Sequence, residues 1–146
     1  MSGDWVVDAS VGIKLFVAEE LSEVADTLFA RLAAQPPTRL YVSDLFYIEC
    51  ANILWKYVQR FGYPVESARQ DVADLTALSL VTVSTADLLG PALELALKYD
   101  ITAYDASYVA LAAQLALPLV TADAALVGKL ASGRVDVRWL GELDMR

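Results

Sequence analysis

Short apolar segments alternate with helical segments along the whole chain, and several of the apolar segments are rich in β-branched residues. Uninterrupted apolar strands that alternate with helices are typical of a parallel sheet covered on both faces by helices. A length of 146 residues fits one domain, and the sequence shows no internal repeat or linker. We therefore predict an α/β fold with a mostly parallel central sheet flanked by helices, as a single domain over residues 1–146. The predicted strands are residues 5–7, 40–42, 80–83, 119–121 and 135–139, and the predicted helices are residues 11–16, 22–34, 45–59, 65–77, 84–99, 102–115 and 124–130.

Polar residues just before several of these helices predict how the helices are capped. Ser, Thr and Asp side chains accept hydrogen bonds from the free amides of a first helical turn. The predicted caps are a Ser43–Asp44 pair before residue 45, a capping box of Ser84 with Asp87, and a capping box of Thr102 with Asp105.

The residue types that are rare or missing exclude several classes of chemistry. The sequence has no histidine, so it cannot build a Ser-His-Asp triad, a Cys-His pair or a histidine-ligated zinc site. A single cysteine, Cys50, excludes an intrachain disulfide and fits a reducing compartment. The first residues lack the pattern of a signal peptide, and the apolar run over residues 108–120 is too short to span a membrane. We expect a cytoplasmic protein without a membrane-bound part.

Four acidic residues fall where the predicted strands meet the helices that follow them. Asp8 directly follows strand 5–7, and Asp123 follows strand 119–121. In an open parallel sheet, ligands bind outside the carboxyl ends of the strands, so these residues share one edge. Glu49 lies one turn into the helix after strand 40–42, and Asp105 lies in the first turn of the helix after Thr102. The four acids are therefore expected to converge at one edge of the sheet.

Three of these acids also have a simple structural explanation. Asp8 could be a turn residue, Asp123 an N-cap, and Asp105 the partner of Thr102 in a capping box. Glu49 has none as simple, because it shares a side of its helix with Leu45, Ile48 and Asn52, which we expect to be the apolar side. A carboxylate on an apolar side is costly unless it is paired or bound to a metal. The set of four acids is more informative than any single one.

Four carboxylates without a histidine suit Mg²⁺ or Mn²⁺, because these hard cations prefer oxygen ligands. Such ions activate water and neutralise the charge that develops at phosphorus during displacement. A formal net charge of -8 and a sequence pI of about 4.4 argue against nucleic acid in general. A bound cation reverses the local charge of such a site, however. Metal-assisted phosphodiester hydrolysis is the reaction that the residues themselves suggest.

Other enzymes with acids at the edge of an α/β sheet need residues that this chain lacks. A haloacid-dehalogenase-like phosphotransferase needs Asp-x-Asp after its first strand, where this chain has Asp8-Ala9-Ser10. A response-regulator receiver needs a lysine at the end of a late strand, and neither Lys14 nor Lys129 lies there. The sequence contains no Gly-x-x-x-x-Gly-Lys-Ser/Thr loop and no Gly-x-Gly-x-x-Gly motif.

Four segments of the sequence combine these acids with a distinctive order and spacing: Val6–Ser10, Tyr47–Leu54, Thr102–Ala112 and Leu119–Asp123. In order, spacing and chain length, they resemble the PIN-domain nucleases, particularly the VapC toxins of bacterial and archaeal toxin–antitoxin pairs. The resemblance covers essentially the whole chain, and the third segment is the most specific.

The resemblance implies a metal-dependent endoribonuclease. Asp8, Glu49, Asp105 and Asp123 match the acidic quartet that binds Mg²⁺ or Mn²⁺ and activates the attacking water. Ser10, Asn52 and Thr121 match polar positions that support the acids or the scissile phosphate, although Ser10 and Thr121 could equally be ordinary cap residues. VapC toxins act on RNA and are usually homodimers held by an inhibitory antitoxin. The resemblance therefore implies an RNA substrate, a homodimer and a VapB-type antitoxin encoded nearby.

Basic and aromatic residues near the acids are candidates for holding RNA. Lys14, Lys56 and Arg60 are candidate phosphate contacts, with solvated surface positions as the alternative. Phe46, Tyr47 and Tyr104 could stack on unpaired bases, or they could pack in the core.

Apolar residues of two helices predict a surface for the antitoxin, with a plain buried core as the alternative. They are Val24, Leu28 and Leu32 in one helix and Phe46, Ile53, Leu54, Trp55, Tyr57 and Val58 in another.

Two other functions remain open at this point. The chain could be a non-catalytic module whose acids bind a metal or the arginines of a partner, or a housekeeping RNA-processing nuclease without an antitoxin.

Overall fold

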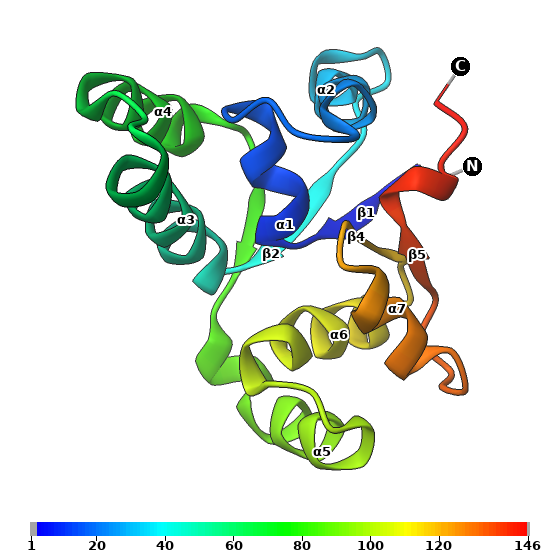
Figure 1. The fold of residues 1–146 in the computed structure, drawn as a ribbon. Coiled ribbons are helices and arrows are strands. Elements are labelled where there is room, and N and C mark those ends of the chain that lie inside the picture. The colour runs from blue at the N-terminus through cyan, green and yellow to red at the C-terminus, as the bar shows by residue number, and fades with distance from the viewer. Residues whose placement is uncertain (1–2, 146) are drawn as a thin grey trace.

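Five parallel strands form the centre of the fold in a computed structural model that describes residues 3–145 (Figure 1). Their order across the sheet is β3-β2-β1-β4-β5, and every neighbouring pair is parallel. The α/β prediction is therefore confirmed, while the two ends of the predicted domain over residues 1–146 lie outside the described residues. The strands are β1 (Trp5–Val7), β2 (Leu40–Ser43), β3 (Val81–Val83), β4 (Leu119–Thr121) and β5 (Val137–Trp139).

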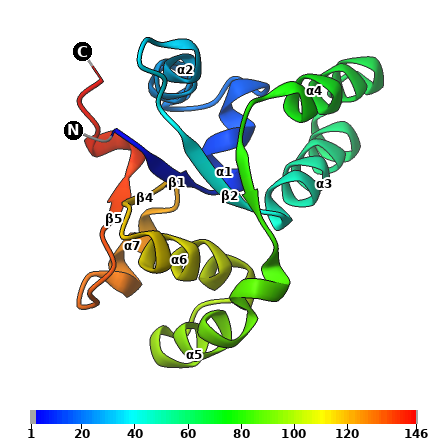
Figure 2. The same cartoon turned by 180° about the vertical axis from the view of Figure 1, so that it is seen from behind.

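Helices cover both faces of this sheet, as Figures 1 and 2 show from opposite sides. The strand order runs outward from β1 to β3 and then returns to β4 on the other side of β1. Right-handed crossovers place the helices of these two halves on opposite faces. The first half contains α1 (Ala9–Gly12), α2 (Ser22–Ala30), α3 (Leu45–Phe61) and α4 (Val65–Ala77), and the second contains α5 (Leu89–Tyr99), α6 (Ala103–Leu115) and α7 (Ala124–Leu130).

Helix α6 is the most deeply buried helix of the second half. It lies between the sheet and α5, and every residue from 106 to 112 is buried. Small side chains make this possible, because alanines let a helix approach both neighbours closely. The first turn of the same helix contains Asp105, so the burial of α6 fixes the position of one of the predicted acids.

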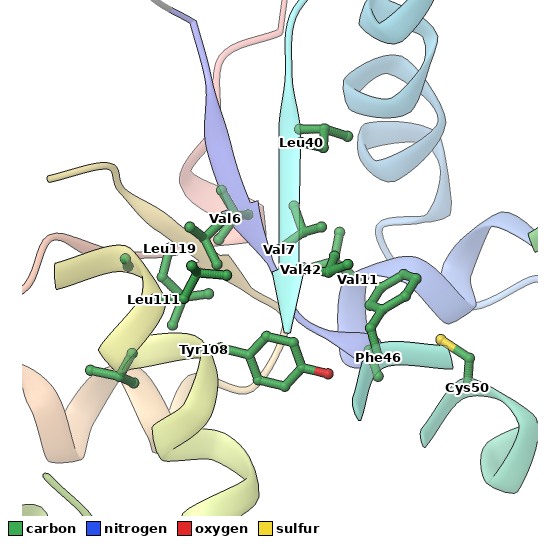
Figure 3. Packing of buried hydrophobic residues seen from close by; sticks show 14 of the residues in the cluster. Val6, Val7, Val11, Leu40, Val42, Phe46, Cys50, Tyr108, Leu111 and Leu119 are labelled. Carbon is green, nitrogen blue, oxygen red and sulfur yellow. The ribbon is translucent and has the colours of Figure 1, made fainter. Parts of the chain in front are cut away.

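Buried residues from both helical layers meet on the two sides of the central strands (Figure 3). Val6 and Val7 of β1 are fully buried, as expected for the middle strand of a covered sheet. Leu111 and Tyr108 of α6 pack on one side, and Phe46 of α3 packs beside α1 on the other (Figure 3). Each fully buried aliphatic or aromatic side chain contributes roughly 1.5–3 kcal/mol through burial of apolar area.

The predicted cap pair of Ser43 and Asp44 bonds to other partners in the structure. Asp44 has helical backbone angles, and its side chain makes no cap bond to α3. Its Oδ1 accepts instead from the amide of Thr85, 3.0 Å away, at the start of the 3₁₀ turn η3 (Thr85–Leu88). Ser43 is buried at the end of β2, and its hydroxyl lies 3.0 Å from that of Ser107.

The two predicted capping boxes are confirmed in their first residue. Thr102 Oγ1 accepts from the amide of Asp105 at 3.1 Å. Ser84 Oγ accepts from the amide of Ala86 at 3.2 Å, so its backbone partner is Ala86 and not Asp87. Both cap residues have extended backbone angles, which lets their side chains reach the first turn.

Several predicted boundaries change by a few residues. Residues 11–16 were expected as one helix, but the structure has α1 followed by the 3₁₀ turn η1 (Ile13–Leu15). The predicted helix over residues 22–34 ends as α2 and the turn η2 (Arg31–Ala33), and a last turn η4 (Leu140–Glu142) follows β5. Helix α3 reaches Phe61 and ends at Gly62, whose φ of 66° is left-handed and suits glycine. None of the helices in residues 3–145 combines the length and apolar character that crossing a membrane requires.

We predict that Gly12→Ala lowers the stability of the fold. A Cβ at Gly12 would overlap the ring of Phe46, which is fully buried and cannot move aside freely. Overpacking of this kind costs about 1–3 kcal/mol, and chemical denaturation measures it.

Gly128→Ala is the matched control, because nothing lies within 4 Å of a Cβ built at Gly128 in α7. Alanine in a helix interior is better than glycine by roughly 0.5–1 kcal/mol, so this variant should become more stable. Equal gains in both variants would contradict the close packing of α1 on α3.

Candidate active site

The first of the predicted acids, Asp8, lies where the strand order reverses, between the carboxyl ends of β1 and β4. Asp8 directly follows β1 and is only 5% exposed. Its Oδ1 accepts from the hydroxyl of Ser10 at 2.5 Å and from the amide of Val11 at 3.3 Å, which also caps α1. A crevice at such a reversal is the usual ligand site of an open parallel sheet.

Ser10 connects the ends of these two strands. Its Oγ accepts from the amide of Ala122 at 2.9 Å and lies 3.3 Å from Thr121 Oγ1, while it donates to Asp8. Thr121 in turn accepts from the amide of Asp123 at 3.1 Å. These contacts link Asp8 to Asp123 through Ser10 and Thr121.

Glu49 is held from the other side by Tyr108 of α6. The Tyr108 hydroxyl donates to Glu49 Oε1 at 2.7 Å, and the ring is buried below the end of β2 with its hydroxyl toward α3 (Figure 3). Tyr108 is not among the site residues predicted from the sequence. Its spacing from Asp105 was the available signal, because residues three apart lie on one side of a helix.

All four predicted acids line one small cavity of about 150 Å³. Asp8 and Asp123 follow β1 and β4, whereas Glu49 lies in α3 and Asp105 in α6, and all four share this cavity with Ser10, Ile53 and Tyr108. Asn52 lies outside it, in a larger neighbouring hollow, and is exposed. The structure thus brings the acids together with Ser10 but separates them from Asn52.

Burial and mutual repulsion make charge unfavourable for three of these carboxyl groups. Burial raises the pKa of Asp8 from 3.8 to about 6, although the hydrogen bonds from Ser10 and Thr121 oppose the shift. Burial also raises the pKa of Glu49, and the nearby Asp105 charge adds to this effect. The pKa of Asp105 is raised first by burial and then by Asp123, while Thr102 and Lys129 lower it. A positive charge in the cavity would relieve all three costs.

The donor set of this cavity fits Mg²⁺ or Mn²⁺, since it consists of carboxylate and hydroxyl oxygens. Within residues 3–145, however, no three acidic or cysteine side chains are arranged so that they could hold an ion together. Mg²⁺ commonly keeps several waters and takes only one or two carboxylates directly. The cavity therefore fits a partly hydrated cation better than a cage made of protein ligands.

The candidate phosphate contacts occupy three different environments. Lys14 is 11% exposed at its side chain, and its Nζ lies 3.5 Å from Glu19 Oε1 and 2.7 Å from the carbonyl of Glu20, so it is engaged with that loop. Lys56 lines the larger hollow beside the acids. Arg60 is exposed near the end of α3 and lines none of the cavities described here.

Lys129 is a cation near the acids that the sequence analysis did not select. Its Nζ donates to the carbonyl of Asp100 at 2.8 Å, and the residue lines a cavity of about 310 Å³ together with Asp105 and Asp123. The sequence could have indicated this residue, because Lys129 lies in the last turn of the helix that Asp123 caps.

The exposed side of α3 differs from the prediction. Ile48 and Asn52 were expected on the apolar side with Glu49, but Ile48 is 66% exposed and Asn52 is exposed. The buried side consists of Phe46, Cys50 and Leu54, which pack toward α1 and the sheet. Glu49 is therefore half-buried by its contact with Tyr108 and not by an apolar face of its own helix.

The predicted antitoxin surface is partly core. Leu28, Phe46 and Leu54 are fully buried or nearly so, and the other aliphatic and tyrosine side chains of the set are half-buried. Trp55 is 56% exposed and is the one member of that set that remains a large exposed side chain.

Residues 5–128 match the sequence model of the PIN domain. The chain belongs to the PIN-domain family. It is 38% identical over 126 residues to ribonuclease VapC3 from Pyrobaculum aerophilum, covering 85% of this chain and 92% of that protein. The resemblance predicted from the four sequence segments is thus confirmed.

Solved structures of similar proteins agree with this PIN fold. PAE2754 from Pyrobaculum aerophilum matches with a TM-score of 0.68 and 25% identity, over 97% of this chain and 93% of that chain. A chain in a toxin–antitoxin complex from Klebsiella pneumoniae matches with a TM-score of 0.63 and 17% identity, over 94% of this chain and 98% of that chain.

We predict that Asp8→Asn stabilises this PIN domain when metal is removed with EDTA. The Asp8 carboxyl has a pKa of about 6 in the folded protein against 3.8 when unfolded, so its charge opposes folding above pH 6. Asparagine removes this buried charge and its cost. A shift of this size corresponds to about 1–3 kcal/mol.

Because the pKa of Asp8 is raised on folding, the stability gained by Asp8→Asn depends on pH. Below about pH 4 the carboxyl is neutral in both states, so the gain should be absent there and grow between pH 4 and pH 6. Thermal melts of both proteins across this range measure it. A gain that stays constant with pH would show that the buried charge is not its origin.

Proposed function

We propose that this PIN domain is a metal-dependent endoribonuclease and the toxin of a VapBC-type pair. The observation that carries the proposal is the single cavity lined by Asp8, Glu49, Asp105 and Asp123, in which charge is costly until a cation binds. The 38% identity to ribonuclease VapC3 supports RNA as the substrate.

The four acids would hold a partly hydrated Mg²⁺ or Mn²⁺, some of them through its bound waters, and the ion would lower the pKa of water and neutralise charge on the phosphate oxygens. Glu49 is suited to take the proton of the attacking water. Its pKa is raised, and Tyr108 fixes Oε1 by a hydrogen bond of 2.7 Å, which leaves Oε2 for the water. The water oxygen forms a bond to phosphorus while the bond from phosphorus to the leaving ribose oxygen breaks.

Ser10 and Thr121 have a positioning role in this proposal. Ser10 is hydrogen-bonded both to Asp8 and to the amide of Ala122, which directly follows β4. These bonds keep Asp8 and Asp123 at a fixed separation. Val11 supplies a second donor to Asp8, and together these bonds orient the carboxylate before any ligand arrives.

We predict that purified protein cleaves RNA with Mn²⁺ or Mg²⁺ and not with EDTA. Asp8→Asn and Glu49→Gln should each reduce the rate by at least about 100-fold, the usual scale for losing a general base or a metal ligand. Gel analysis of a pool of intact structured RNAs gives the readout. The expected stability of Asp8→Asn separates loss of chemistry from loss of fold.

Cleavage that persists in Asp8→Asn would refute the assignment of the acidic cavity. Well-folded wild-type protein that binds a partner but cuts no RNA would favour a non-catalytic module. Cleavage without an inhibitor gene nearby would indicate a housekeeping nuclease.

A homodimer and an antitoxin partner belong to the same proposal. Leu89, Leu93 and Leu97 are 67%, 54% and 71% exposed and recur every four residues along α5, which suits packing against a second copy. Trp55 and Phe61 of α3 and Val65 and Val72 of α4 are also apolar and exposed, on two neighbouring helices that suit a helix of a VapB-type antitoxin. The toxin–antitoxin complex from Klebsiella pneumoniae supports such a partner.

We predict that Leu93→Asp converts the dimer to a monomer, because a carboxylate in an apolar interface loses its hydration without gaining a partner. Light scattering after gel filtration measures the mass. Val72→Asp is the control, since Val72 is a similarly exposed residue of α4. A dimer that survives Leu93→Asp would place the contact between copies elsewhere.

A further inference from the structure

The largest of the cavities described opens directly beside the acids and has no role in the chemistry above. It measures about 640 Å³ and shares Glu49 and Ile53 with the acidic cavity. Its volume lies within the roughly 300–1,000 Å³ typical of small-ligand sites. A group bound in this hollow would therefore touch the acidic site along its α3 side.

An exposed aromatic ring and an exposed aliphatic side chain border the hollow. Tyr104 is 62% exposed and Ile48 is 66% exposed, and both line it. The other two aromatic candidates are engaged elsewhere, because Phe46 is fully buried and the Tyr47 hydroxyl lies 2.9 Å from Thr82 Oγ1. Tyr104 directly precedes Asp105, so both residues lie in the first turn of α6.

Polar groups enter the hollow from one side of α3. Asn52 and Lys56 both line it, at three and seven residues beyond Glu49. These spacings place all three side chains on nearly the same side of the helix. The hollow thus combines an apolar wall, an amide that can bond to a base edge, and a cation, in a chain whose net charge is -8.

We propose that this hollow binds one unpaired base of the RNA, next to the phosphate that is cut. The base stacks on Tyr104, and Lys56 contacts the adjoining phosphate. Stacking on an aromatic side chain is the common way in which proteins hold single-stranded nucleic acid. The proposal rests on the nuclease function above and assigns the residues that hold the strand.

A base fits this hollow better than a second copy of the chain does. The hollow shares Glu49 and Ile53 with the acidic cavity, where a phosphate must lie for the proposed reaction. The apolar stripe of α5, which suits a second copy, does not line it. An amide and a cation within the hollow match the polar edge and the phosphate of a nucleotide.

The first test measures binding without cleavage, in the Asp8→Asn background with Mg²⁺ present. The probe is a single-stranded RNA of eight nucleotides that contains 2-aminopurine, whose fluorescence falls when it stacks on a ring. Tyr104→Ala should weaken binding by roughly 5- to 100-fold and abolish the quenching. Tyr104→Phe should retain both, and Trp55→Ala should change neither, since Trp55 is exposed on α3 but lies outside the hollow.

The second test measures how binding depends on salt. Loss of one phosphate contact lowers the slope of log K against log salt by about 0.7 for a single strand. Lys56→Ala should show this change, and Lys98→Ala should not, because Lys98 lies over the Tyr99 ring on α5 and outside the hollow.

The outcomes separate this proposal from the nuclease proposal. Tyr104-dependent binding without cleavage by the wild-type protein would support the base site and contradict the nuclease. Cleavage with unchanged binding and quenching in Tyr104→Ala would contradict the base site alone. A changed oligomeric mass of Tyr104→Ala, with RNA binding unaltered, would instead make this face a contact between copies and overturn the proposal.

Discussion

A buried carboxylate at the end of the central strand is the constraint on which the rest of the site depends. Asp8 has almost no access to water, yet it lies at the edge where the acids of three other segments converge. Ser10 and Val11 supply the donors that make this burial tolerable. Because Ser10 also binds the backbone after β4, the carboxylate and the two-strand junction are fixed by the same few hydrogen bonds.

Much of the fold follows from the sequence because its local and long-range requirements agree. The apolar strands could only be buried in a covered sheet, and the rule that ligands bind at the carboxyl ends of parallel strands then brings Asp8 and Asp123 to one edge. Thr102 with Asp105 was predictable for the same reason, since a cap needs only its own helical turn. All four acids were within reach of this reasoning.

Features that depend on tertiary contacts could not be predicted from the sequence. The hydroxyl of Tyr108 reaches Glu49 across 59 positions of sequence, and Asp44 bonds to Thr85 across 41. The exposed face of α3 was misassigned because Ile48 is apolar but points away from the core, while Phe46 and Cys50 make the contact with α1 and the sheet. Periodicity identifies a helix but does not identify which of two apolar stripes is covered.

The acidic cavity carries a stability cost that the proposed metal binding would relieve. Burial raises the pKa of Asp8, Glu49 and Asp105, so holding their charges together without a cation costs free energy that ligand binding can release. The surrounding core, with Val6 and Val7 of β1 fully buried, supplies the rigidity that keeps these groups close despite their repulsion.

Helix α6 has a consequence for how such a protein can change over time. It has no solvent-facing side from residue 106 to residue 112, and it carries both Asp105 and Tyr108. Substitutions there would disturb packing and chemistry together, whereas the exposed residues of α3, α4 and α5 can vary with little effect on the interior. Under the proposed function, partner contacts on the outer helices could therefore change while the acidic cavity keeps its geometry.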